Sequence, residues 1–171
     1  GPDAAVSVPG HDWFATPLLG SGGVTYSPDC FSCDHDSSSD ELPPRERIAA
    51  DDHWRVAHCM DTALPGWLVL LPRRHVTSIA DLTDAEAAGL GVWQVRLSQA
   101  RREVTGCVKT YVVQFAEAEG FSHVHFHVVP RMADVPPERR GPGVFGYLHP
   151  ANGVTAERMD EIAVALAGQL R

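Results

Sequence analysis

His-Val-His-Phe-His-Val-Val-Pro, residues 123–130, sets three histidines two residues apart and fills the gaps with apolar side chains. Two residues is the repeat of a β-strand, so in a strand the three imidazoles face one side, while Val124, Phe126 and Val128 face a core. Neighbouring imidazoles then lie roughly 6.5 Å apart. Such a row can bind a metal ion, attack an electrophile or hold an anion. We prefer these interpretations to a strand that is merely rich in histidine.

A second informative block lies upstream of the three histidines. Residues 64–75 read LPGWLVLLPRRH, and Ile-Ala-Asp-Leu follows at 79–82. Together the two blocks resemble the histidine triad (HIT) family of nucleotide hydrolases and transferases. That family has a similar strand that ends in Pro-basic-basic-His, then a helix, and then the triad. The resemblance covers roughly residues 50–131, and the blocks stand in the family order.

The resemblance implies an α+β fold with an antiparallel sheet of about five strands and two principal helices. The sequence patterns agree with this fold. Apolar runs predict β-strands near residues 53–59, 66–72 and 109–116, in addition to the triad strand.

Helix signals complete the expected domain. Thr83-Asp-Ala-Glu is a capping box that opens a helix running to about Val104, and a last helix is expected from about Thr155. We expect one HIT-like domain over residues 29–171. Residues 1–28 are rich in Gly, Pro and Ser and are interpreted as an irregular N-terminal arm.

Composition and charge restrict the class of protein. The 171 residues carry a formal net charge of −8 with histidine neutral, which argues against nonspecific binding to nucleic acid. No apolar run approaches the roughly 20 residues of a membrane span, and no secretory signal is visible, so we expect a cytoplasmic protein without a membrane partner. The four cysteines are then expected to be thiols or metal ligands rather than disulfides.

Cys30-Phe-Ser-Cys33 is a C-x-x-C motif, which by itself indicates a zinc half-site, a redox pair or chance. The redox interpretation needs a strand–helix context, and residues 34–41 do not look helical. Zinc needs two more ligands. The family resemblance implies His75 and His123 for these, with His35 as a competitor, and it implies a closed zinc site with a structural role.

Two triad histidines remain for chemistry. An unprotonated imidazole is a good nucleophile toward phosphorus at neutral pH, and the middle histidine has a neighbour on each side to flank a phosphate. We therefore expect His125 to be the nucleophile and His127 to donate a hydrogen bond to a nonbridging oxygen. In the HIT family the middle histidine likewise attacks the α-phosphate and forms a nucleotidyl-histidine intermediate.

Four further residues are implied in substrate binding by their similarity to family positions. Asp61 is the match for an aspartate that binds ribose hydroxyls, although a turn-capping role explains it nearly as well. Gln114 and Ser122 are candidates for phosphate contacts. Arg131 is a candidate for neutralising a distal phosphate.

Trp67 is the clearest departure from the family, since many members have histidine directly after the Pro-Gly pair. This departure, together with the shortened loops, indicates a divergent branch of the family. Two other classes therefore stay open: a metal-centred hydrolase or lyase that uses triad histidines as zinc ligands, and a nucleotide-binding protein without turnover. The resemblance also implies a homodimer acting on a small nucleotide, such as a dinucleoside polyphosphate or a phosphoramidate.

Overall fold

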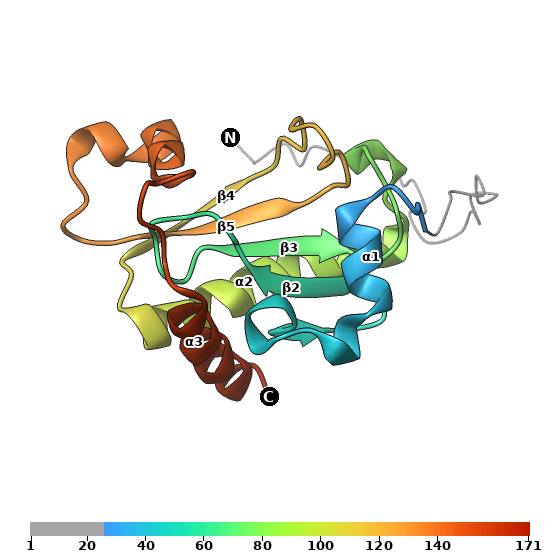
Figure 1. The fold of residues 1–171 in the computed structure, drawn as a ribbon, viewed down its shortest axis with the longest axis horizontal. Helices are drawn as coiled ribbons and strands as arrows, with labels where there is room; N and C mark the ends of the chain where they lie inside the picture. Colours follow the sequence, from blue (N-terminus) through green and yellow to red (C-terminus); the bar gives the residue numbers. More distant parts are fainter. Residues whose placement is uncertain (1–25) are drawn as a thin grey trace, which may run out of the picture.

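The computed structural model describes residues 26–171, so most of the predicted N-terminal arm lies outside the described residues. Its centre is a five-stranded antiparallel sheet in the order β1-β2-β3-β5-β4 (Figure 1). The strands are β1 (Ala49–Ala50), β2 (Trp54–His58), β3 (Leu68–Pro72), β4 (Lys109–Val113) and β5 (Phe126–Arg131). The α+β fold with about five strands is thereby confirmed.

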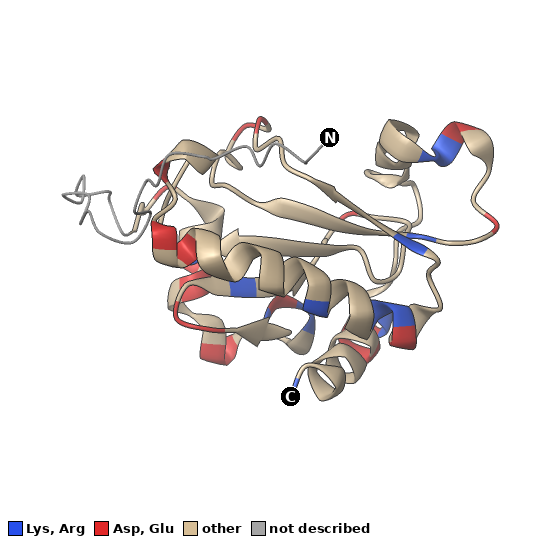
Figure 2. Cartoon of the chain, turned by 180° about the vertical axis from the view of Figure 1, so that it is seen from behind, with Lys and Arg blue, Asp and Glu red and all other residues tan. Residues whose placement is uncertain are grey.

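Three α-helices accompany this sheet in the described chain: α1 (Phe31–Ser37), α2 (Asp84–Thr105) and α3 (Ala156–Gln169). The long helices α2 and α3 lie on the same face, as Figure 2 shows from behind. Side chains from that face and from both helices form the main core, which includes Trp54, Leu70, Leu97, Phe126 and Leu166. No helix within residues 26–171 is long and apolar enough to cross a lipid bilayer.

The helix ends follow the predicted signals. The Thr83 side chain accepts from the Glu86 backbone N–H, and the Glu86 carboxylate accepts from the Thr83 N–H, which completes the capping box. Gly106 ends α2 with a left-handed φ of 71°. The hydroxyl of Thr155 caps α3.

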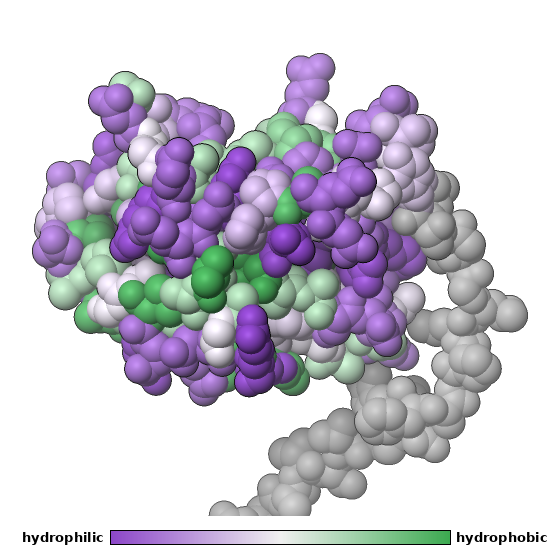
Figure 3. All heavy atoms as spheres, turned by 60° about the horizontal axis from the view of Figure 1, so that its bottom comes forward, coloured by the Kyte–Doolittle hydropathy of each residue, from purple (hydrophilic) through white to green (hydrophobic). Residues whose placement is uncertain are grey.

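On the side of the molecule seen in Figure 3, hydrophilic residues surround a smaller group of hydrophobic ones.

A second, smaller apolar cluster lies on the opposite face of the sheet. Its buried members are Leu64, Trp67, Val129 and Val144, and Phe145 packs against them. Val144 and Phe145 belong to the 3₁₀ segment Gly141–Tyr147, which lies at the end of the sheet away from α1 (Figure 1). The triad face of the sheet is thus bordered by α1 at one end and by this segment at the other.

Two predictions about local structure were wrong. The segment after Cys33 is helical through Ser37, because Arg55 and Arg73 bind α1 to the sheet. The triad strand was expected from residue 123, but β5 begins at Phe126. Continuing the register of β3 against β5 would place Pro72 opposite Val124, and proline has no N–H to give to the ladder.

Candidate active site and metal centre

Two hydrogen bonds, made by His123 and Val124, hold the residues just before β5 in place of strand pairing. The Val124 N–H donates to the Val76 carbonyl over 2.8 Å, and the ring Nε2 of His123 donates to the Pro72 carbonyl over 2.7 Å. Because a carbonyl oxygen only accepts, Nε2 of His123 carries the hydrogen and Nδ1 keeps its lone pair. This is the usual way in which a second partner orients a histidine for a metal.

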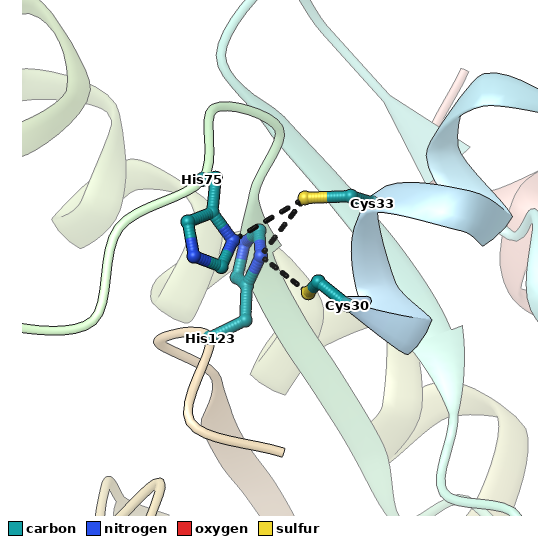
Figure 4. Close-up of side chains that lie close together, drawn as sticks. All are labelled: Cys30, Cys33, His75 and His123. Carbon is teal, nitrogen blue, oxygen red and sulfur yellow. Dashed lines mark hydrogen bonds between the residues drawn. The ribbon is translucent and has the colours of Figure 1, made fainter. Parts of the chain in front are cut away.

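The lone pair of His123 points into a group of four possible ligands. The ligand atoms of Cys30, Cys33, His75 and His123 all lie within 4.8 Å of one another (Figure 4). The Sγ–Nδ1 distances are 3.4 Å for Cys33–His75, 3.5 Å for Cys30–His123 and 3.7 Å for Cys33–His123. Tetrahedral zinc with ordinary bond lengths separates sulfur and nitrogen ligands by about 3.6 Å. The four residues fit zinc in both type and spacing.

In the absence of a metal ion, burial shifts the pKa of two of these groups, Cys33 and His123. It raises the pKa of Cys33, and the neighbouring Cys30 acts in the same direction. It lowers the pKa of His123 to about 4. A bound cation reverses the effect on the thiols, because it favours the thiolate. His35 is not part of the group: its ring stacks on Phe31 at 3.9 Å.

Helix α1, which follows Cys30 and carries Cys33, is also attached to the sheet by direct contacts. The guanidinium of Arg55, nearly all of which is buried, donates to the Ser32 carbonyl. Arg73 forms an ion pair of 3.1 Å with Asp36. A metal ion would therefore reinforce an attachment that α1 already has.

His125 lies beside this centre, with a defined tautomer. Its Nδ1 donates to the His123 carbonyl over 2.8 Å, so the proton sits on Nδ1 and Nε2 has a free lone pair. Its ring lies 5.0 Å from the ring of His127, centroid to centroid. The backbone of the candidate zinc ligand thus sets the nitrogen that His125 can use in an attack.

His127 has the opposite tautomer. The indole N–H of Trp67 donates to its Nδ1 over 3.0 Å, so the neutral ring carries its proton on Nε2. Burial, and to a smaller extent the charge of a protonated His125, lower the pKa of His127 to about 4. Trp67 and Phe145 pack edge-on against the ring. The sequence marked Trp67 only as a departure from the family pattern, although an indole N–H is a hydrogen-bond donor.

The structure places the predicted substrate-binding residues at different distances from the triad. Gln114 directly follows Val113, which pairs with His127 across β4 and β5, so its backbone lies beside the triad strand, while strand alternation turns its side chain away from the triad face. Ser122 is exposed, immediately before His123. The position of Ser122 is compatible with a contact to a phosphate at His125, whereas Gln114 can make one only if its side chain turns at the end of β4.

Asp61 and Arg131 lie in less direct positions. Asp61 is half exposed, and its carboxylate lies 2.6 Å from Nδ1 of His149. Arg131 is the last residue of β5, six positions beyond His125, which is about 20 Å along an extended chain. It can reach a distal phosphate only if the substrate is long.

Comparison with known proteins agrees with this geometry. The family model described as HIT domain matches residues 42–134, more than half of the chain. The chain belongs to the HIT domain family. No curated protein sequence matches it significantly.

Solved structures of HIT proteins share the fold. A histidine triad protein from Bradyrhizobium japonicum has 25% identity and a TM-score of 0.62, covering 79% of this chain and 96% of its own. A Zn-bound histidine triad family protein from Mycobacterium smegmatis has 18% identity and a TM-score of 0.61, covering 82% and 92%. A Hit-like protein involved in cell-cycle regulation from Bartonella henselae has 21% identity and a TM-score of 0.60, covering 77% and 90%.

Proposed function

We propose that this HIT protein is a nucleotide hydrolase or nucleotidyltransferase in which His125 attacks the α-phosphorus of a nucleoside phosphate ester, anhydride or phosphoramidate. The observation that carries the proposal is the pair of complementary tautomers. His125 offers a lone pair on Nε2, and His127, 5.0 Å away between ring centroids, offers a proton on Nε2. A nucleophile next to a hydrogen-bond donor is the arrangement that phosphoryl transfer needs.

The reaction has two displacements. Nε2 of His125 forms a bond to phosphorus, and the bond to the leaving group breaks with its electron pair. The Nδ1–H of His125 remains hydrogen-bonded to the His123 carbonyl oxygen, and this bond stabilises the positive charge of the modified ring. His127 donates from Nε2 to a nonbridging oxygen that gains charge. Water or another acceptor then attacks phosphorus, releases His125 and loses a proton to solvent.

Substrate contacts are assigned to four residues. Gln114 and Ser122 contact the reacting phosphate; the exposure of Ser122 beside His123 supports its part, and Gln114 follows the end of β4 next to the triad strand. Asp61 accepts hydrogen bonds from the ribose hydroxyls once its contact with His149 Nδ1 is broken, and its exposure makes the carboxylate accessible to a ligand. Arg131 meets the far phosphates of long substrates such as dinucleoside polyphosphates.

Zinc completes the proposal as a structural ion held by Cys30, Cys33, His75 and His123. The ligand spacing supports it, as does the similar fold of the M. smegmatis protein, which is described as Zn-bound. Four protein ligands leave no open position for a water molecule. The ion would therefore fix the His123 backbone, to which His125 is bound, rather than activate a nucleophile. This favours the HIT mechanism over a metal-centred hydrolase.

The edge of the sheet supports a homodimer. Among residues 26–171, β4 has a neighbouring strand on one side only, and the nearby Val108 and Val112 are exposed, as is Val95 on α2. These three valines line a groove of about 430 Å³ between α2 and β4. Antiparallel pairing of β4 with the same strand of a second copy would cover this apolar edge. Val112→Lys should then give a monomer in light scattering, whereas Val164→Lys on the exposed face of α3 should not.

A substrate panel tests the catalytic proposal. Adenosine, guanosine and uridine polyphosphates and phosphoramidates are incubated with the protein, and released mononucleotide is measured. His125→Ala should remove turnover and leave nucleotide binding largely intact, and the control His53→Ala, at an exposed turn, should behave like the parent protein. Tight binding without any release would instead identify a nucleotide-binding protein.

A further inference from the structure

The backbone that leads into Trp67 is fixed by hydrogen bonds to two buried side chains, in addition to the packing of its indole. Gly66, which precedes it, donates its N–H to Nε2 of the buried His58 over 2.9 Å. The Gly66 carbonyl accepts from the buried guanidinium of Arg101, which also binds the Val128 carbonyl of β5. The indole itself is fully buried. His58 and Arg101 therefore fix the backbone before Trp67, and through Arg101 they fix the position of the indole N–H relative to β5.

An indole N–H can donate but cannot accept or pass on a proton. As long as it points at Nδ1 of His127, that nitrogen cannot be protonated without bringing two N–H groups face to face. Within residues 26–171 the His127 ring packs against the rings of Trp67, Phe145 and His125, its cross-strand partners are Val69 and Val113, and the charged group that acts on its pKa is His125. None is an anion that would stabilise an imidazolium, and His125 is the one titratable group among them. His127 can thus share its Nε2–H in a hydrogen bond but cannot act as a general acid.

We propose that Trp67 is a positioning residue that fixes His127 as a hydrogen-bond donor, and that this restricts the enzyme to leaving groups that depart as stable anions. The substrate class is then the nucleoside phosphoanhydrides, not phosphoramidates or alkyl esters. This inference rests on the proposed function and narrows it.

The proton balance of the first displacement explains the restriction. When Nε2 of His125 forms its bond to the α-phosphorus of an anhydride, the P–O bond breaks and the electron pair leaves on a phosphate oxygen. A phosphate carries that charge at neutral pH, so no proton is needed. An amine or an alkoxide needs a proton as the bond breaks, and neither His127 nor Trp67 has one to release. A general acid contributes typically 10²–10⁴-fold to rate, and its absence slows these substrates by a similar factor.

A spectroscopic test addresses Trp67 without any substrate. In protein labelled with ¹⁵N-histidine, the His127 ring should show an unprotonated Nδ1 that is hydrogen-bonded and a protonated Nε2. Trp67→Phe keeps an aromatic ring but removes the donor, so the ring of His127 should become a mixture of both tautomers. Trp93→Phe is the matched control, since that buried indole donates to Asp51, away from the triad. A protonated Nδ1 in the parent protein overturns the proposal, whatever the activity.

A kinetic test addresses the substrate class. With each nucleoside, kcat/KM is measured for the 5′-triphosphate, which releases pyrophosphate, and for the 5′-phosphoramidate, which releases ammonia. We expect the triphosphate to be faster by about 10²–10⁴-fold. Trp67→His, whose ring can accept and pass on a proton, should narrow that ratio. Trp67→Phe should lower kcat on the triphosphate by about 10–100-fold with little change in KM.

The outcomes separate the two proposals. Equal rates on both substrates, abolished by His125→Ala, overturn the restriction to anhydrides and leave the proposed function standing. A triphosphate preference that Trp67→His leaves unchanged overturns the role of Trp67. Turnover that survives in His125→Ala overturns the proposed function, and the narrower inference falls with it.

Discussion

Replacing Gly66 by alanine should destabilise the protein by an amount that follows from its backbone. Gly66 has a φ of 82°, and a Cβ built on it lies 2.9 Å from Cγ2 of Thr105. The left-handed backbone costs a residue with a Cβ about 1–2 kcal/mol, and the crowded methyl adds about 1 kcal/mol. The backbone cannot rotate away freely, because His58 and Arg101 bind the two polar groups of Gly66. We expect a total loss of about 2–3 kcal/mol.

Urea unfolding and thermal melting measure this loss. For a domain of this size each kcal/mol lowers Tm by about 2–4 °C, so Gly66→Ala should melt roughly 4–12 °C below the parent. Gly91→Ala is the control, because Gly91 lies in α2 with open space where a Cβ would sit. It should be neutral or stabilise the protein by up to about 1 kcal/mol.

Thr105→Ser separates the two contributions. Serine keeps the hydroxyl that accepts from the Cys107 N–H but lacks the Cγ2 methyl. Combined with Gly66→Ala it should recover the steric part, about 1 kcal/mol, and leave the backbone part in place. If Gly66→Ala is as stable as the parent, or if serine at position 105 recovers nothing, then the account of how Trp67 is held is refuted.

Three further predictions concern the metal, the ribose and pH. One zinc ion per chain should be found by elemental analysis, and Cys33→Ser should lower Tm more than the intrinsic rate; a metal-free protein that is folded and fully active would contradict this. Asp61→Ala should weaken binding of ribonucleotides and leave 2′,3′-dideoxy analogues nearly unchanged, whereas equal losses would exclude ribose binding. The pKa of His127 is lowered from 6.5 to about 4 in the folded protein, so the unfolded chain binds the proton more readily. The free energy of unfolding should therefore be highest above pH 6.5 and should fall by up to about 3 kcal/mol toward pH 4. Urea titrations at both pH values should show a smaller fall for His127→Gln, and an unchanged fall would exclude His127 as its source.

Much of this architecture could be predicted because its signals are local in the sequence. The two-residue repeat of the triad indicated a strand, and the strict apolar run from Trp67 to Leu71 indicated a central one. The capping box located the start of α2 at the correct residue. The metal group was predicted through the family resemblance, which supplied His75 and His123, and the structure brings both to the C-x-x-C cysteines.

The remaining features depend on tertiary contacts. A helix as short as α1 has little intrinsic stability, and the contacts of Arg55 and Arg73 that hold it leave no periodic pattern. The bond between Trp67 and His127 joins residues sixty positions apart. It depends on the register of β3 against β5. Because Leu68 pairs with Val128, the side chains of Trp67 and His127 become diagonal neighbours.

The central claim, a covalent intermediate on His125, is tested most directly by trapping it. The protein is mixed with a nucleotide labelled at the α-phosphorus, quenched rapidly without acid, digested and mapped. Label is expected on the peptide that contains His125 and is expected to be absent in His125→Ala. Replacing His127 by alanine should lower the rate by about 10²–10³-fold and leave the label on His125. Label on a different residue, or near-normal turnover by His125→Ala, would contradict this claim.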